Sequence, residues 1–233
     1  MASIVLAHSP LTGPAAWGRL PQVLHVRGHR VVVLDVTDDD EPPYAARYVA
    51  RAALQIDAAG VDGPAVLAGH SGAGYLLPQL GATQRAARRG VRGYVFVDAG
   101  IPHGRGATRL TLLRTEDPAM AEQLEAMLGD GRRFPEWTAP DLRHLVPDDG
   151  ERAALVASLR PRGHDFFTEP MPFPVDWPDA PCGYVRLSTA YDVPARVSRS
   201  RGWPGVERDA GHFGACADPA GVADDIETVM AQL

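Results

Sequence analysis

Apolar and polar residues alternate in blocks along the first hundred positions, and the blocks predict strands and helices in turn. Four short runs are almost continuously apolar: residues 3–8, 30–36, 64–68 and 91–97. Such runs suit strands that are covered on both faces of a parallel sheet. Segments with a helical pattern separate the runs: about 15–27, 44–59 and 75–89. The alternation predicts an α/β fold with a mostly parallel central sheet and helices on both faces.

The alternation stops between residues 101 and 181. This segment has no strong strand, and prolines and glycines break its helical pieces: about 118–128, 139–145 and 150–159. Strand patterns resume at residues 183–188 and 205–208. A helical pattern follows each of them, at about 194–201 and 219–232. We therefore expect a core made of residues 1–100 and 182–233, with residues 101–181 as an inserted helical cap. A cap of this kind shapes an apolar pocket.

The strongest chemical signal is the sequence Gly69-His70-Ser71-Gly72-Ala73-Gly74, between the third apolar run and the next helix. A serine flanked by very small residues between a strand and a helix is typical of a nucleophile elbow. The turn would aim the Ser71 hydroxyl at the N-terminus of the helix, where free N–H groups favour negative charge. The sequence therefore predicts Ser71 as a catalytic nucleophile.

A nucleophilic serine needs a base, an acid that orients the base, and donors for the oxyanion. His212 is the candidate base, because it lies in a glycine-flanked loop after the last strand and follows the serine in the required chain order. Asp192 is the favoured acid, 20 residues before His212 and just after a strand. Asp98 is its rival, because it ends the fourth strand at the same edge of the sheet. Asp192 could instead be only a helix N-cap.

The first loop decides how complete the oxyanion site is. Gly72 N–H, directly after the serine, is the first expected donor, and the second should come from the loop that begins at His8. Pro10 has no N–H to give. If the donor belongs at this position, the oxyanion site is only half complete; if the loop is shifted by one residue, Leu11 N–H is the second donor. Candidate substrate contacts are the residues His8, Pro10, His70 and Trp137.

These motifs together resemble the α/β-hydrolase superfamily, in particular its small methylesterase and hydroxynitrile-lyase branch and the bacterial members like it. The resemblance rests on the loop from His8 to Trp17, the elbow at residues 69–74, the strand end Phe96-Val97-Asp98 and the sequence Gly211-His212-Phe213. It implies an α/β-hydrolase fold with a helical cap and a triad of Ser71, His212 and an acid. The chain departs from the usual pattern at Ala73, at His8-Ser9-Pro10 and in the short interval from Asp192 to His212.

Composition narrows the choice of chemistry. The net charge is −6 and all 23 basic residues are arginines, so we expect no nucleic-acid partner and no lysine-based mechanism. Cys182 and Cys216 lie far apart, without metal-ligand spacing, and no glycine-rich dinucleotide loop is present, so we expect no metal and no cofactor. With no signal peptide and no membrane-length apolar run, we expect a cytoplasmic protein with no membrane partner. The oligomeric state, a homodimer included, stays open.

Three functions fit these residues. The first is a serine hydrolase of the esterase, thioesterase or lactonase type that acts on a small, mainly apolar carbonyl substrate. The second is a non-hydrolytic lyase or cyclase of secondary metabolism, in which Ser71 and His212 act as acid–base groups. The third is a binding protein without catalysis. The intact pair of Ser71 and His212 argues against the third.

Overall fold

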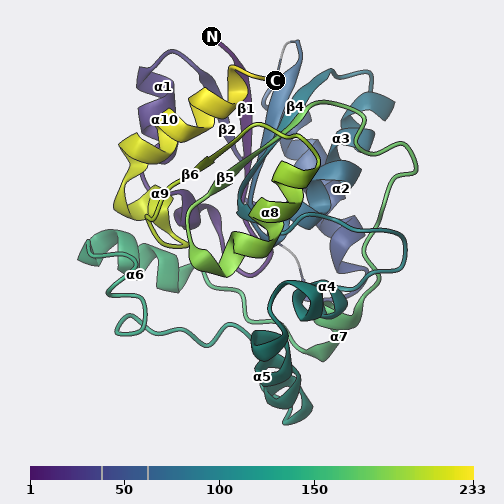
Figure 1. Ribbon diagram of the computed structural model, residues 1–233, viewed down its shortest axis with the longest axis vertical. Coiled ribbons are helices and arrows are strands. Elements are labelled where there is room, and N and C mark those ends of the chain that lie inside the picture. The colour runs from purple at the N-terminus through teal and green to yellow at the C-terminus, as the bar shows by residue number, and fades with distance from the viewer. Residues whose placement is uncertain (38, 62) are drawn as a thin grey trace.

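Six parallel strands form the central sheet of the computed structural model, which describes residues 1–37, 39–61 and 63–233. Their order is β2-β1-β3-β4-β5-β6 (Figure 1). The strands are β1 (Ser3–Ala7), β2 (Arg30–Val33), β3 (Ala65–Ser71), β4 (Val91–Ala99), β5 (Cys182–Arg186) and β6 (Gly205–Glu207). Every described pair of neighbouring strands is parallel. The predicted α/β fold with a parallel sheet is confirmed.

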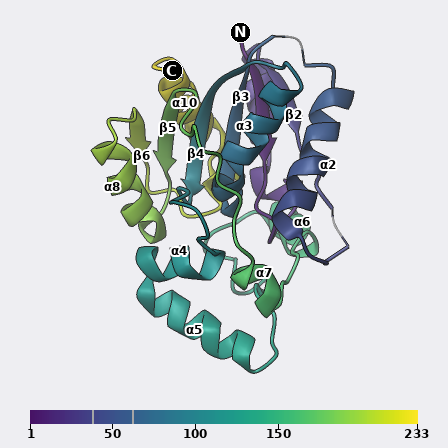
Figure 2. The same cartoon turned by 90° about the vertical axis from the view of Figure 1, so that its right-hand side faces the viewer.

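Helices cover both faces of this sheet because successive strand residues point to opposite sides. Along β1, Ile4 and Leu6 pack in the cluster that includes α1 (Leu20–Val26) and α10 (Pro219–Met230). Val5 and Ala7 pack in the cluster on the other side, with α2 (Tyr44–Ala58), α3 (Leu77–Ala86) and α8 (Asp192–Ser200). Figure 2 shows α2 and α3 on one side of the sheet and α10 behind it.

The segment between β4 and β5 contains four helices: α4 (Arg109–Glu116), α5 (Pro118–Gly129), α6 (Asp149–Ala157) and α7 (His164–Thr168). In both views α4, α5 and α7 lie beyond the carboxyl ends of the strands (Figures 1 and 2). The helix expected at 139–145 is a series of turns instead. Pro140 and Pro147 bound it, and i→i+3 hydrogen bonds such as Leu145 N–H to Leu142 C=O form within it. The division into core and cap remains a prediction about domains.

The sequence reading missed α4, which begins with a local signal. The Thr108 hydroxyl accepts a hydrogen bond from Thr111 N–H, and the Thr111 hydroxyl accepts one from Thr108 N–H. This reciprocal arrangement satisfies two backbone donors at the start of the helix. None of the described helices is both long and apolar enough to span a bilayer.

Candidate active site

Ser71 lies at the carboxyl end of β3, where the chain turns into the short 3-10 helix η2 (Gly72–Leu76). Its backbone has φ 57° and ψ −128°, a conformation that non-glycine residues rarely adopt. Small neighbours make the turn feasible, since a Cβ on Gly74 would come within 2.3 Å of the Gly100 carbonyl oxygen. Ala73 is fully buried and fits without a glycine. The backbone therefore has the strained geometry of a nucleophile elbow.

His212 is held by Asp98. Its Nδ1 lies 2.8 Å from Asp98 Oδ2, and Asp98 has no solvent exposure at the end of β4. Burial alone would raise the pKa of Asp98, but hydrogen bonds from His212, Ser188 and Leu187 outweigh it and lower the pKa. The carboxylate therefore stays ionised and fixes the imidazole with Nδ1 protonated. This tautomer leaves Nε2 free to accept a proton.

Asp192, the favoured acid in the sequence reading, lies elsewhere. It begins α8, and its carboxylate accepts a hydrogen bond from Arg186 Nε at 2.8 Å. Arg186 also pairs with Asp209. The structure therefore corrects the expected pairing: Asp98, not Asp192, contacts His212. Asp98 lies near the carboxyl end of β4, whereas Asp192 follows β5 and begins α8, where it contacts Arg186 instead of His212.

Tyr191 is a site residue that the sequence reading missed. Its hydroxyl lies 3.1 Å from Ser71 Oγ, and its ring stacks on the His212 ring at a centroid distance of 5.1 Å and an angle of 5°. Burial, and then the charge of Asp98, raise the pKa of Tyr191, so the phenol stays neutral. Its position between β5 and α8, next to the candidate acid Asp192, was the sequence signal that could have identified Tyr191 as a site residue. Tyr191 thus contacts both the Ser71 hydroxyl and the face of the His212 ring.

Residues 9–11 and Gly72, where the oxyanion donors were expected, line the same cavity as Ser71. Leu11 N–H, expected to bind the oxyanion, instead donates to Ser9 Oγ at 3.3 Å. Pro10 has no N–H, so this loop gives no free backbone donor at the expected place. Ser9 Oγ lies directly beside Gly72, 3.1 Å from the point where a Cβ on Gly72 would stand. The Ser9 hydroxyl is therefore a polar group beside Gly72.

His8 and His70, two expected substrate contacts, are buried away from the cavity. Val36 N–H donates to His8 Nε2, and His8 Nδ1 donates to the Ser9 carbonyl. His70 Nε2 lies 2.8 Å from the His212 carbonyl oxygen and so supports the loop that carries the base. Burial lowers the pKa of His8 to about 4 and that of His70 to about 3. Neither residue lines the cavity, and both form hydrogen bonds that support the surrounding loops.

The buried His70 makes a pH-dependent contribution to stability. Its folded pKa lies below the unfolded value of about 6.5, so the unfolded chain binds the extra proton and stability falls as the pH drops from about 6.5 towards 3. Between pH 7 and pH 5 we expect the wild type to lose about 2 kcal/mol more unfolding free energy than His70→Gln. Urea titrations at both pH values measure this difference. The exposed His25→Gln is the control, and equal losses in wild type and His70→Gln would contradict the expectation.

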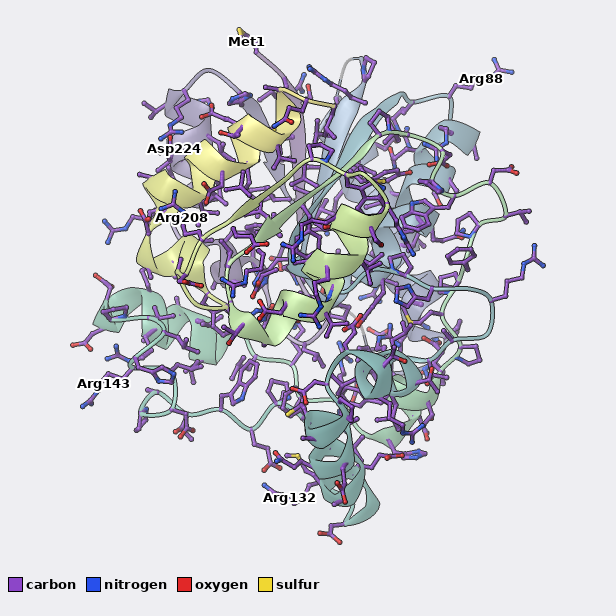
Figure 3. All side chains as sticks on the ribbon, in the orientation of Figure 1. Met1, Arg88, Arg132, Arg143, Arg208 and Asp224 are labelled. Atoms are coloured by element: carbon purple, nitrogen blue, oxygen red, sulfur yellow. The ribbon has the colours of Figure 1, made fainter. Side chains whose placement is uncertain are left out.

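A cavity of about 490 Å³ lies at this site, and both Ser71 and His212 line it. Of the expected substrate contacts, Pro10 and Trp137 line it too. Most of the remaining wall is apolar: Leu113, Met120, Leu124, Phe134, Leu142, Leu145, Phe166, Phe167 and Phe213. Whereas arginines such as Arg88, Arg132 and Arg143 extend outward (Figure 3), Arg109 is buried and borders the cavity. The size and lining suit a small, mainly apolar molecule.

The described residues contain no cluster of side chains suited to bind a metal ion. Within residues 1–37, 39–61 and 63–233, no three His, Cys, Asp or Glu side chains are placed to hold an ion. Cys182 and Cys216 are both buried free thiols, and burial raises the pKa of each to about 12. Neither thiol is therefore activated as a nucleophile.

Comparison with solved structures places this geometry among known folds. An extracellular α/β-hydrolase from a Paenibacillus species shares 17% identity over 98% of this chain and 99% of that one, with a TM-score of 0.77. A pyrethroid hydrolase from Sphingobium faniae shares 18% identity over 99% and 97% of the two chains, with a TM-score of 0.71. A tomato methylketone synthase I variant shares 14% identity over 99% and 98%, also with a TM-score of 0.71. At such identities the likeness shows the fold.

Sequence comparison gives the family itself. No curated protein is similar enough in sequence to count as a match. The family model described as "Alpha/beta hydrolase family" matches residues 4–225, which include most of β1, the elbow and the His212 loop. The resemblance inferred from the motifs is thereby confirmed, and the chain belongs to the alpha/beta hydrolase family.

Proposed function

We propose that the protein is a serine hydrolase for a small, mainly apolar ester, thioester or lactone. One observation carries this proposal: the Asp98–His212 hydrogen bond lies beside the strained Ser71, and one apolar cavity borders both Ser71 and His212. In this proposal Ser71 is the nucleophile, His212 the base and Asp98 the acid. The cavity has room for a small substrate and few polar groups to bind a large charged one.

In the reaction, the Ser71 hydroxyl turns from Tyr191 towards His212 Nε2 and gives up its proton there. Ser71 Oγ then attacks the carbonyl carbon, and the negative charge passes to the carbonyl oxygen. His212 returns the proton to the leaving alcohol, thiol or ring oxygen as the bond to the carbonyl carbon breaks. A water molecule then gives a proton to His212 and attacks the acyl carbon. The bond from this carbon to Ser71 Oγ breaks, and His212 returns the proton to Oγ as the carboxylic acid leaves.

Gly72 N–H and the Ser9 hydroxyl are the proposed donors to the oxyanion. Because Ser9 Oγ already accepts from Leu11 N–H, its own proton is free to point into the cavity that Ser9 lines. This hydroxyl would replace the backbone donor that Pro10 lacks. A preorganised donor of this kind stabilises the transition state more than the bound substrate.

Ser9→Ala is expected to lower kcat by about 10²–10³-fold with little change in KM, the usual loss for one oxyanion donor. Ser9→Thr keeps the hydroxyl and should retain most of the wild-type rate. Steady-state kinetics on a short-chain p-nitrophenyl ester measure both variants. A Ser9→Ala protein with wild-type kcat would exclude Ser9 from the oxyanion site.

A non-hydrolytic lyase or cyclase is the second candidate, favoured by Pro10 and by the Tyr191–Ser71 contact. A site with only one backbone oxyanion donor suits acid–base chemistry better than acyl transfer, and Tyr191 would give it another acid. The tomato relative, named a methylketone synthase, shares the same fold. Turnover of short-chain esters, thioesters or lactones by the wild type supports the hydrolase. Its absence in the folded protein favours this second candidate.

A further inference from the structure

Glu116 is a carboxyl group in the cavity wall formed by α4 and α5, a wall that also includes the charged residues Arg109 and Asp117. It lines the same cavity as Ser71, with Leu113 and Met120 beside it in that wall. Oε2 accepts a hydrogen bond from the Tyr75 hydroxyl at 2.8 Å. Oε1 is shielded from solvent and has no partner among the described residues. Buried polar atoms are nearly always hydrogen-bonded, so Oε1 calls for an explanation.

No cation offsets the charge of this carboxyl within the described residues. Burial raises the pKa of Glu116 to about 7, and the hydrogen bond from Tyr75 offsets this rise only in part. Arg109 lies two turns away on α4, where its Nη1 binds the Phe166 carbonyl oxygen and pairs with Glu169. Whether ionised or protonated, the carboxyl keeps an oxygen that can accept a hydrogen bond.

Tyr75 ties Glu116 to the catalytic turn. It follows Ser71 by four residues in η2, and its ring fills the space beside Gly100, where a Cβ would come within 2.1 Å of it. Burial, Asp98 and then Glu116 raise the pKa of Tyr191, the residue that contacts Ser71. The carboxyl is therefore fixed in place and within electrostatic reach of the reacting groups.

We propose that Glu116 binds a hydrogen-bond donor, an O–H or N–H group, on the part of the substrate that lies against α4. The proposal rests on the proposed function and deepens it, because it gives the apolar substrate one polar end. A wholly apolar substrate would exclude water from this wall and leave Oε1 without a partner. A substrate with a hydroxyl or ammonium group at that end would supply the missing donor, so the carboxyl selects for it.

Binding tests the proposal without requiring turnover. The probes are non-hydrolysable ketones of equal length, ending in a methyl, a hydroxyl or an ammonium group, and calorimetry measures their Kd on Ser71→Ala. We expect the hydroxyl or ammonium ketone to bind at least ten-fold more tightly than the methyl ketone. Adding Glu116→Leu should abolish this preference. With Glu116→Gln added, the hydroxyl ketone should still bind more tightly than the methyl ketone, but the ammonium ketone should not. This difference separates recognition of an O–H group from recognition of a charged N–H group.

A matched control is Glu122→Gln, an exposed glutamate on α5 that should leave every ratio unchanged. Equal or undetectable binding of the three ketones, or a preference that persists in Glu116→Leu, would overturn the proposal. Ester turnover by the wild type is measured separately. A folded protein that prefers the hydroxyl ketone but hydrolyses no ester would keep the Glu116 site and refute the hydrolase.

Discussion

Replacing Asp98 by Asn should lower kcat by about 10⁴-fold, the loss expected when the base is held in the wrong tautomer. Asp98 Oδ1 accepts from the N–H groups of Leu187 and Ser188, so the amide oxygen of Asn would take that place. The amide NH₂ would then face His212 Nδ1 and force the proton onto Nε2. An imidazole protonated at Nε2 cannot accept the proton of Ser71.

Asp192→Asn is the matched control, because the structure places this carboxylate on Arg186 rather than on His212. Its kcat should stay within about ten-fold of the wild type, an allowance for its position next to Tyr191. Steady-state kinetics on one ester compare both variants, with circular dichroism to show that they fold. A severe loss in Asp192→Asn together with an active Asp98→Asn would reverse the assignment of the acid.

Ser71→Ala should lower ester turnover by at least about 10⁴-fold, because the acyl-enzyme cannot form without the hydroxyl. Alanine is smaller than serine and fits the same crowded turn, so the fold should persist. Active-site titration and steady-state rates measure the loss. Activity on a non-ester substrate that survives in Ser71→Ala would point instead to the lyase or cyclase.

The sequence correctly predicted the features that depend on residues close together in the chain, such as the strands and the turn at Ser71. The apolar runs predicted the strands of a parallel sheet, and the glycines around Ser71 predicted a turn that leaves no room for larger side chains. His212 was predicted from its glycine-flanked loop after the last strand together with its place in the chain order. The strand and turn predictions need only neighbouring residues, and the observed backbone at Ser71, with φ 57°, has the geometry that the predicted turn implies.

The parts that sequence reasoning misplaced depend on distant contacts. The sequence favoured Asp192 as the acid over Asp98, but in the structure the His212 imidazole and the N–H groups of Leu187 and Ser188 all bind Asp98. Leu11 was expected to face the oxyanion, but its N–H is taken by the Ser9 hydroxyl. Glu116 lies in a helix that the sequence reading missed, so its place in the cavity was beyond a pattern-based prediction.

Fluorophosphonate labelling tests the central claim, an activated Ser71, most directly. The probe forms a stable bond only with an activated serine, and trypsin releases Ser71 in a peptide of residues 52–85 that contains no other serine. Mass spectrometry should find one adduct per chain on this peptide, none in Ser71→Ala and much slower labelling in Asp98→Asn. A folded wild-type protein that stays unlabelled, or that carries the adduct on another peptide, would contradict the account.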